Sequence, residues 1–243
     1  MQKTILIIIP VFNEVENLQA VLNELKTEIH DADILVVNDG STDHTQTILE
    51  NRSDIHWLSL PFNVGYSLAL KAGFRYATRQ EYDLVLQFDG DGQHLASEAE
   101  KLIKYLIETK SDIVIGSRFM EKSDYPHSSI RKLGTGIFHS MIRFFCGQSI
   151  YDPTSGFQAL SRRVVQLYSE MPYFPQFPDA NLIVDMILRG YKVTEIPVKM
   201  RPRLAGKGMH ENIFSSGYYM MLMLYNIFII LVKHGFRKKG ELK

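Results

Sequence analysis

Short apolar runs alternate with amphipathic stretches through the first half of the chain. Buried strands are predicted where a continuous apolar run is bounded by polar residues, over residues 4–10, 33–39, 55–60, 83–88 and 112–116. Helices are predicted between them, over residues 15–29, 40–51, 66–78 and 97–110, with Ser41 or Thr42 as the N-cap of the second. This alternation predicts an α/β fold with a mostly parallel, doubly wound sheet. Ligands of such sheets bind beyond the carboxyl ends of the strands.

The second half of the chain has a looser pattern. It predicts helices over residues 129–145 and 180–189, a short strand at the end of 152–161, and a strand over 192–200. Asp179 follows a loop rich in proline and aromatic residues and is expected to cap the helix after it. No linker divides the chain, so we expect one domain over residues 1–210 and a helical tail over 211–243.

The predicted tail contains an apolar stretch, residues 213–232, that has twenty residues and no charge. Its length would cross a membrane core of about 30 Å, but it includes two serines, an asparagine and three tyrosines. From Lys199 onward the chain carries nine basic and two acidic residues, a net charge of +7 against −7 for the rest. Basic flanks stay on the cytoplasmic side. We therefore expect a helix that lies in the membrane plane, is re-entrant, or docks on a small membrane protein, with a single span as the alternative.

The composition bears on the size of the core, the cellular compartment and the class of partner. With 243 residues, 45% of them hydrophobic, the chain can bury a substantial core. One cysteine excludes a disulfide framework and favours a reducing compartment, here the cytoplasm. The acidic body carries no base-stacking module, so no nucleic-acid partner is expected.

Two carboxylates, Asp89 and Asp91, directly follow the fourth predicted strand. Ionised carboxylates are costly to bury unpaired, and a divalent cation would stabilise such a pair. Mg²⁺ and Mn²⁺ prefer hard oxygen ligands, usually one or two carboxylates plus substrate phosphates. Gly90 would let the backbone turn between them, and Gln93 offers another oxygen. The alternative is a polar loop that caps the next helix.

Several motifs stand together at the predicted strand ends. In chain order they read "IPVFNE", "VVNDGSTD", "NVGYSLALKAG", "FDGDGQH", "GSRF" and "DPTSGFQAL". Together they resemble the family 2 glycosyltransferases of GT-A fold, in particular the polyprenyl-phosphate branch (dolichyl-phosphate mannose or glucose synthase-like). The resemblance covers roughly residues 4–210. Asn38 departs from the aspartate that is common in the second motif, and many relatives carry several membrane spans where this chain has one apolar stretch.

The resemblance implies a role for each matching position. Residues expected to bind the donor are Pro10, Phe12 and Glu14 around the base and ribose, Asp39 on the base, and Asp89. Residues expected to hold Mg²⁺ or Mn²⁺ on the diphosphate are Asp89, Asp91 and Gln93. Residues expected at the acceptor are Arg118, Arg131, Ser155 and Arg203. Asp91, Arg118 and Asp152 are the expected catalytic residues. Ordinary structural roles are open for several of them: a turn at Asp39 and Asp152, a helix-dipole contact at Glu14, and a solvated surface position at Arg131.

The implied reaction is inverting transfer of a hexosyl unit from a nucleoside-diphosphate sugar to a polyprenyl phosphate at the cytoplasmic face of a membrane. A phosphate acceptor is already anionic, so Asp152 would position groups rather than remove a proton. In a first alternative the acceptor is a hydroxyl of a lipid-linked or polymeric saccharide, and Asp152 is the general base. In a second, the chain is a non-catalytic nucleotide-sugar-binding scaffold.

Overall fold

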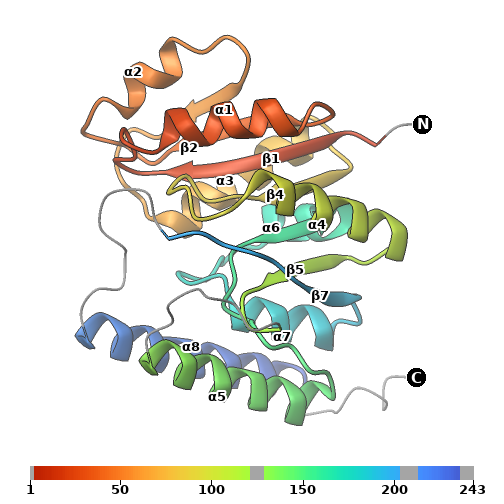
Figure 1. The fold of residues 1–243 in the computed structure, drawn as a ribbon. Coiled ribbons are helices and arrows are strands. Elements are labelled where there is room, and N and C mark those ends of the chain that lie inside the picture. Colours follow the sequence, from red (N-terminus) through yellow and green to blue (C-terminus); the bar gives the residue numbers. More distant parts are fainter. Residues whose placement is uncertain (1–2, 121–128, 203–212, 236–243) are drawn as a thin grey trace.

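The computed structural model describes residues 3–120, 129–202 and 213–235, without the side chains of residues 129–133 and 213–216. Its strands form one seven-stranded sheet in the order β3-β2-β1-β4-β6-β5-β7 (Figure 1). The strands are β1 (Ile5–Val11), β2 (Asp33–Asn38), β3 (His56–Ser59), β4 (Leu84–Gln87), β5 (Ile113–Ser117), β6 (Gln158–Ser161) and β7 (Val193–Pro197). Among these described strands, β6 alone is antiparallel to its neighbours, β4 and β5.

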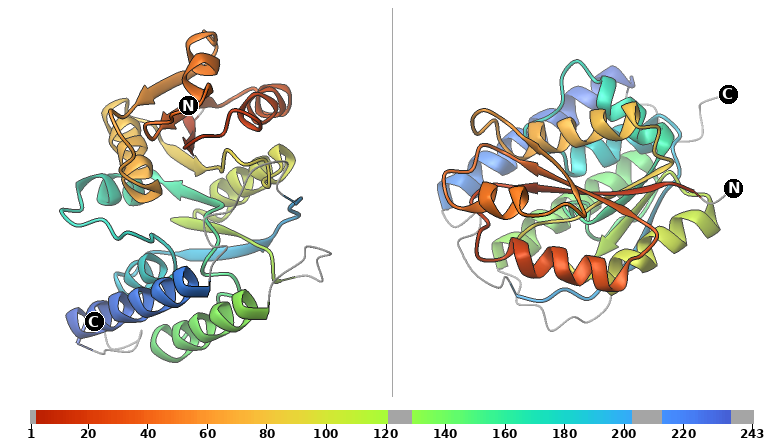
Figure 2. Two further views of the ribbon diagram at one scale, coloured as in Figure 1. Left: turned by 90° about the vertical axis from the view of Figure 1, so that its left-hand side faces the viewer. Right: turned by 90° about the horizontal axis from the view of Figure 1, so that it is seen from above.

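Helices cover both faces of the sheet (Figure 2). They are α1 (Leu18–Glu28), α2 (Thr45–Glu50), α3 (Tyr66–Arg79), α4 (Ala96–Thr109), α5 (Ser129–Cys146), α6 (Arg162–Glu170), α7 (Ala180–Leu188) and α8 (Ile213–Lys233). One apolar core lies between the sheet and α1, α2 and α4, and the other lies between the sheet and α3 and α5–α8. The predicted doubly wound α/β sheet is therefore confirmed.

Two local predictions were wrong. No helix was predicted over residues 162–170, where α6 buries Val164, Val165 and Tyr168. The second helix begins at Thr45, not after Ser41 or Thr42. The reason is that Asn13, just after β1, holds residues 41–43: its N–H donates to Ser41 Oγ, and its Oδ1 accepts the N–H groups of Thr42 and Asp43.

The reversed strand β6 decides where the segment before it lies. Because β6 runs against β4 and β5, its first residue, Gln158, lies at the edge where those two strands end. Residues 152–157 therefore arrive at the carboxyl edge of the sheet, beside the segments that follow β4 and β5. Residues that are far apart in the sequence meet there.

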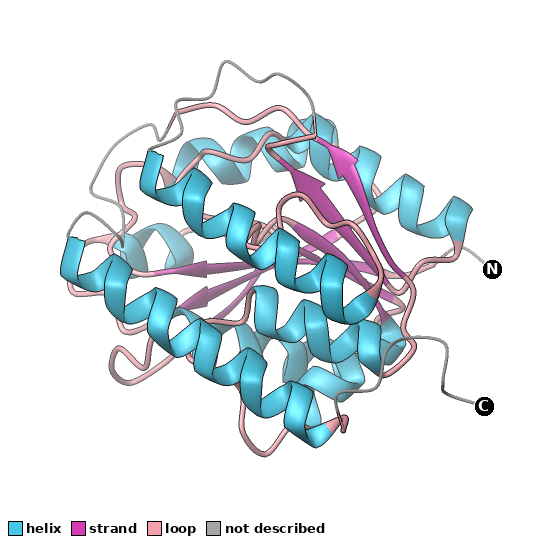
Figure 3. Ribbon diagram, turned by 90° about the horizontal axis from the view of Figure 1, so that it is seen from below, coloured by secondary structure: helices cyan, strands magenta, loops and turns pink. Residues whose placement is uncertain are grey.

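Helix α8 has two different faces. Met223, Ile227 and Leu231 are buried in the core that also contains α7, whereas the opposite face exposes large apolar side chains such as Met221 and Tyr225. α5 and α8 lie side by side along one surface (Figure 3), and a Cβ at Gly134 of α5 would come within 2.6 Å of Met220 of α8.

Over the described ranges, no helix combines the length and apolar character that crossing a membrane requires. The division between residues 210 and 211 falls outside the described residues and stays a prediction.

Candidate active site

The predicted site residues gather at the carboxyl edge of the sheet. Phe12 follows β1, Asp39 follows β2, Asp89 lies two residues after β4, and Arg118 follows β5. These four strands are mutually parallel, so their ends meet at one edge. The sheet itself therefore brings these four predicted site residues together.

Four of the residues expected to bind the donor lie at or after the ends of β1 and β2. Pro10 is buried in β1, Phe12 is 42% exposed, and the Glu14 carboxylate accepts a hydrogen bond from Asn17 Nδ2 at 2.7 Å. Asp39 is buried, and its two carboxylate oxygens accept the N–H groups of Val64 (2.8 Å) and Gly65 (2.9 Å). Asp39 therefore fastens the loop in front of α3. The roles of these four residues toward a nucleotide stay predictions.

The acidic loop after β4 is held on several sides. Asp91 Oδ1 accepts the N–H of Gln93 at 3.0 Å, and the Tyr66 hydroxyl lies 3.4 Å from Asp89 Oδ1. His94 is buried behind the loop, where its Nδ1 accepts the N–H of Asp89 at 3.0 Å and its ring stacks on Phe157 at 4.2 Å. Burial lowers the pKa of His94 to about 3, so its imidazole is neutral.

The turn in this loop is made by a different glycine from the one expected. Gly92, with φ of 78°, makes the turn that was assigned to Gly90. Gly90 instead allows close packing, because a Cβ at this position would lie 2.6 Å from Cγ1 of Val11. Any larger residue at Gly90 would push the acidic loop away from the end of β1.

The donor set of this loop fits a divalent cation that is shared with a substrate. Within the described ranges, no three His, Cys, Asp or Glu side chains are grouped so that they alone could hold a metal ion. Asp89 and Asp91 supply two hard carboxylates, and the Asp89 side chain is 33% exposed. Mg²⁺ and Mn²⁺ are commonly held by one or two carboxylates with substrate phosphates as the further ligands. The residues present therefore suit a metal that takes its further ligands from an anionic substrate.

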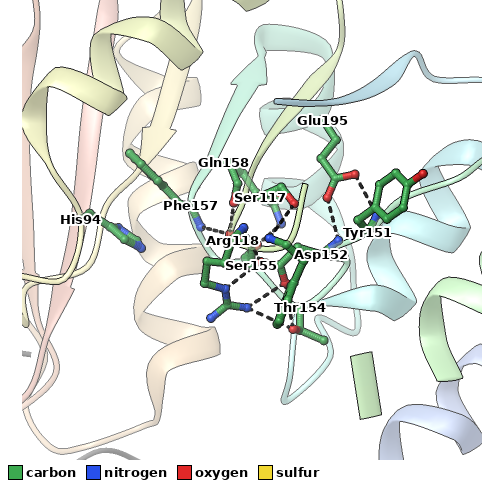
Figure 4. Close-up of polar contacts among 12 residues, drawn as sticks. His94, Ser117, Arg118, Tyr151, Asp152, Thr154, Ser155, Phe157, Gln158 and Glu195 are labelled. Carbon is green, nitrogen blue, oxygen red and sulfur yellow. Dashed lines mark hydrogen bonds and ion pairs between the residues drawn. The ribbon is translucent and has the colours of Figure 1, made fainter. Parts of the chain in front are cut away.

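Two of the expected catalytic residues, Arg118 and Asp152, form an ion pair. The Arg118 side chain donates from Nε to Asp152 Oδ2 at 2.6 Å and from Nη2 to Asp152 Oδ1 at 2.8 Å (Figure 4). The backbone N–H of Arg118 also donates to Asp152 Oδ2, at 3.0 Å. Asp152 is fully buried, and the Arg118 side chain is 13% exposed. Such a two-pronged contact fixes the plane of the guanidinium. A carboxylate used in this way is poorly placed to remove a proton from a substrate.

The other expected acceptor residues differ in what the structure says of them. Ser155 is buried, and its hydroxyl donates to the Gly116 carbonyl at 2.7 Å, so it holds the loop under the site. Arg131 lies in α5, but its side chain is outside the described part. Arg203 lies outside the described residues altogether.

Asp179 was not among the predicted site residues, yet its carboxyl interacts electrostatically with three of them, Arg118, Asp152 and Asp89. It is the N-cap of α7, as expected, but its side chain makes no capping bond; Oδ2 instead accepts the Tyr219 hydroxyl at 2.9 Å. Burial raises the pKa of Asp179 to about 7; the Tyr219 hydroxyl and Arg118 act against this rise, and Asp152 and Asp89 add to it. The sequence contained one indication of this: Asp179 is an acidic residue directly before α7, a helix whose residues are all buried. A carboxyl group whose pKa is raised toward neutral by burial, within electrostatic range of Arg118 and Asp89, is a candidate for proton exchange.

The chain is similar to known glycosyltransferases over most of its length. The family model described as Glycosyl transferase family 2 matches residues 6–168. A polyprenol monophosphomannose synthase of Mycolicibacterium smegmatis is 27% identical over 223 residues, which are 86% of this chain and 84% of the relative. An undecaprenyl-phosphate mannosyltransferase of Micrococcus luteus is 28% identical over 84% of this chain and 86% of its own length.

Solved structures show the same fold. The crystal structure of glucosyl-3-phosphoglycerate synthase from Mycobacterium tuberculosis with Mn²⁺, uridine-diphosphate-glucose and phosphoglyceric acid superposes with a TM-score of 0.71. It is 19% identical, and the match covers 98% of this chain and 82% of that chain. At this identity the likeness shows the fold alone, which is the GT-A fold that the sequence motifs implied.

Proposed function

Because the chain belongs to glycosyl transferase family 2, we propose that it transfers a hexosyl unit from a nucleoside-diphosphate sugar to a polyprenyl phosphate. The relatives named above support the acceptor class, since both are named for transfer to a polyprenol or undecaprenyl phosphate. The observation that carries the proposal is the buried Arg118–Asp152 pair beside the acidic loop. It supplies an oriented cation for an anionic acceptor, and it engages the one carboxylate that had been expected to serve as a base for a hydroxyl.

The donor would bind between the ends of β1, β2 and β4. Pro10, Phe12, Glu14 and the loop fastened by Asp39 would surround the nucleoside. Asp89, Asp91 and Gln93 would hold Mg²⁺ or Mn²⁺ on the diphosphate, where the metal neutralises negative charge on the leaving group. In this arrangement the diphosphate supplies some of the metal ligands, so the protein does not have to hold the metal by itself.

The acceptor phosphate would be oriented by arginines. Arg118 is the described member of this set, with Arg131 and Arg203 as the predicted others. A phosphate oxygen carries its own negative charge near neutral pH, so direct displacement at the anomeric carbon needs no strong base. Asp152 then acts by holding Arg118.

A donor screen tests the proposal. The purified chain, with Mg²⁺ or Mn²⁺ and a short-chain prenyl phosphate, should transfer sugar from one or more nucleoside-diphosphate sugars. Transfer only to hydroxyl acceptors would favour the first alternative. Binding or hydrolysis of nucleotide sugars with no transfer to any acceptor would contradict the proposal, and binding alone would favour a scaffold.

Asp179 gives the hydroxyl alternative its one structural support. A carboxyl with pKa of about 7 suits a general base, and such a base contributes typically ~10²–10⁴-fold to a rate. If the acceptor is a phosphate, Asp179→Asn should keep kcat within about tenfold of the wild type, because no base is needed. The measurement is kcat at saturating acceptor from pH 5.5 to 8.5. A larger loss, with a wild-type kcat that rises with pH through 7 as the carboxyl ionises, would favour the hydroxyl acceptor.

We further infer that the chain is peripheral on the cytoplasmic face of a membrane, attached through the tail from residue 211. The support is the outer face of α8, which exposes apolar side chains along its length and no charged residue before Lys233. Its members are Tyr218, Met221, Leu224, Tyr225, Phe228, Ile229 and Val232. The proposed acceptor is a membrane lipid, so this face has a reason to meet a bilayer. A small membrane protein as a further partner stays a prediction.

The triple variant Met221→Gln/Tyr225→Gln/Val232→Gln should bind vesicles at least about 100-fold more weakly than the wild type. Each apolar side chain that enters the bilayer interface contributes on the order of 1 kcal/mol or more, and these three are 64%, 60% and 49% exposed. Sedimentation with vesicles that contain anionic lipid measures the effect. Deleting the tail would be a poorer test, because the other face of α8 belongs to the core.

The matched control is Phe62→Gln/Leu68→Gln, which removes two exposed apolar side chains, 66% and 47% exposed, that precede or lie in α3. It should bind vesicles as the wild type does. Equal binding by the triple variant would contradict attachment through α8.

A further inference from the structure

Glu195 in β7 holds the backbone of the segment that carries Asp152. Its Oε1 accepts the N–H of Asp152 at 2.6 Å, and its Oε2 accepts the N–H of Tyr151 at 2.8 Å (Figure 4). A carboxylate that accepts two consecutive backbone N–H groups fixes both the place and the direction of that stretch of chain. The direction of the Asp152 side chain depends on this backbone.

The same strand is aligned with the strand that leads to Arg118. In the parallel β5–β7 ladder, Glu195 lies opposite Ile115, and Pro197 lies opposite Ser117. Arg118 is the next residue after β5. Strand β7 therefore positions both members of the ion pair. Its hydrogen bonds to β5 fix the end of that strand, which leads to Arg118, and its Glu195 side chain fixes residues 151–152.

Helix α5 holds the segment from another direction. The His139 ring stacks on Tyr151, with centroids 4.9 Å apart and planes at 24°, and His139 Nδ1 lies 2.7 Å from the Ile150 carbonyl oxygen. Neither contact replaces the acceptors that Glu195 provides for the two N–H groups. A half-buried carboxylate near Asp152 is an unfavourable choice unless its hydrogen bonds are needed, and burial raises the pKa of Glu195 accordingly.

We propose that Glu195 is a positioning residue for glycosyl transfer, which holds residues 151–152 and, through Asp152, sets the plane of the Arg118 guanidinium. This inference rests on the proposed function, in which Arg118 orients an acceptor phosphate. Glu195 itself touches no substrate. Its effect on the reaction passes along a hydrogen-bonded chain, from Glu195 to the 151–152 backbone, to the Asp152 carboxylate, to Arg118. Glu195 also accepts a hydrogen bond from the side chain of Ser117, the residue before Arg118, so both contacts of its carboxylate lead to the same guanidinium.

Glu195→Gln should loosen this chain with little change in shape. Glutamine keeps one acceptor oxygen, but its amide nitrogen would face a backbone N–H. Hydrogen exchange of the 151–152 amides should become about tenfold faster, and the acceptor KM should rise about tenfold, with the donor Kd unchanged. In an Arg118→Lys background, Glu195→Gln should raise the acceptor KM no further, because both changes act through one group.

The control is Asp185→Asn, which alters a buried carboxylate of α7 that bonds Arg189 and His234. It should lower Tm and leave the acceptor KM unchanged. Unchanged exchange at residues 151–152 in Glu195→Gln would overturn the anchoring itself, whatever the acceptor is. Faster exchange with an unchanged acceptor KM, or KM effects that multiply in the Arg118→Lys background, would overturn the coupling. Wild-type protein that transfers to no prenyl phosphate would instead overturn the proposed function, and the exchange measurement would still decide whether Glu195 anchors the segment.

Discussion

Asp91→Asn will reduce metal-dependent transfer by at least about 100-fold while leaving the fold intact. A divalent metal on the leaving diphosphate contributes several kcal/mol of charge stabilisation, and each 1.36 kcal/mol is about tenfold in rate. The variant removes a charged ligand of the proposed site. Its amide oxygen can still accept the bond that Asp91 Oδ1 takes from the Gln93 N–H, so the loop keeps its turn. Transfer rate against Mn²⁺ concentration, together with a thermal melt, measures both parts of the prediction.

Asp54→Asn is a suitable control for this experiment. Asp54 is an exposed aspartate paired with Arg52, away from the carboxyl edge of the sheet, and its replacement should leave both turnover and metal dependence unchanged. Near-normal turnover of Asp91→Asn with an unaltered Mn²⁺ requirement would contradict the metal assignment. An equal loss in both variants would indicate a nonspecific effect of charge.

Asp152→Asn should lower the free energy of unfolding by about 3 kcal/mol, the lower end of the range for removing one partner of a buried ion pair. The Arg118 guanidinium would lose the charge that compensates it, and one of its N–H groups would face the new amide nitrogen. With a prenyl phosphate as acceptor, the kinetic loss should fall mainly on the acceptor KM, because the residue holds Arg118 and removes no proton.

Denaturant unfolding and steady-state kinetics separate these two effects. Arg118→Lys is a useful variant for comparison. It keeps a positive charge near Asp152 but cannot form the bidentate hydrogen bonds to the carboxylate, so it should destabilise the protein less than Asp152→Asn. If kcat of the Asp152→Asn variant instead falls by about 100-fold or more while the acceptor KM is unchanged, Asp152 acts as a base after all.

The grouping of the residues expected to bind the donor could be predicted from sequence, because they lie at or just after the ends of apolar strands. In a parallel sheet the strand ends share one edge, so Phe12, Asp39 and Asp89 needed no further information to be placed together. The same logic placed Arg118 at the end of β5. What these side chains bond was less accessible: the carboxylate of Asp39 is used by the N–H groups of residues 64 and 65.

The arrangement of the residues expected at the acceptor depends on contacts that no local sequence pattern displays. Strand β6 has four residues, and nothing in them reveals that it runs backwards between β4 and β5. The pairing of Asp152 with Arg118, 34 positions away, follows from that reversal. Asp179 was assigned a capping role because its position is that of an N-cap, yet its side chain turns to a tyrosine of α8. Its pKa depends on burial in the folded chain and on charges from distant parts of the sequence, which sequence spacing cannot show.

The reversed strand also has a consequence for synthesis of the chain. One edge of β4 pairs with β1, which is made earlier, but the other edge waits for β6, about 70 residues later. At roughly 5–20 residues per second on a ribosome, that is several seconds during which a fully buried strand of the finished sheet has an uncovered edge, the feature that invites pairing with other chains. The segment that delivers Asp152 to the active site is also the one that closes the sheet. A nascent chain halted before β6 would therefore carry its acidic loop on an open and aggregation-prone half-sheet.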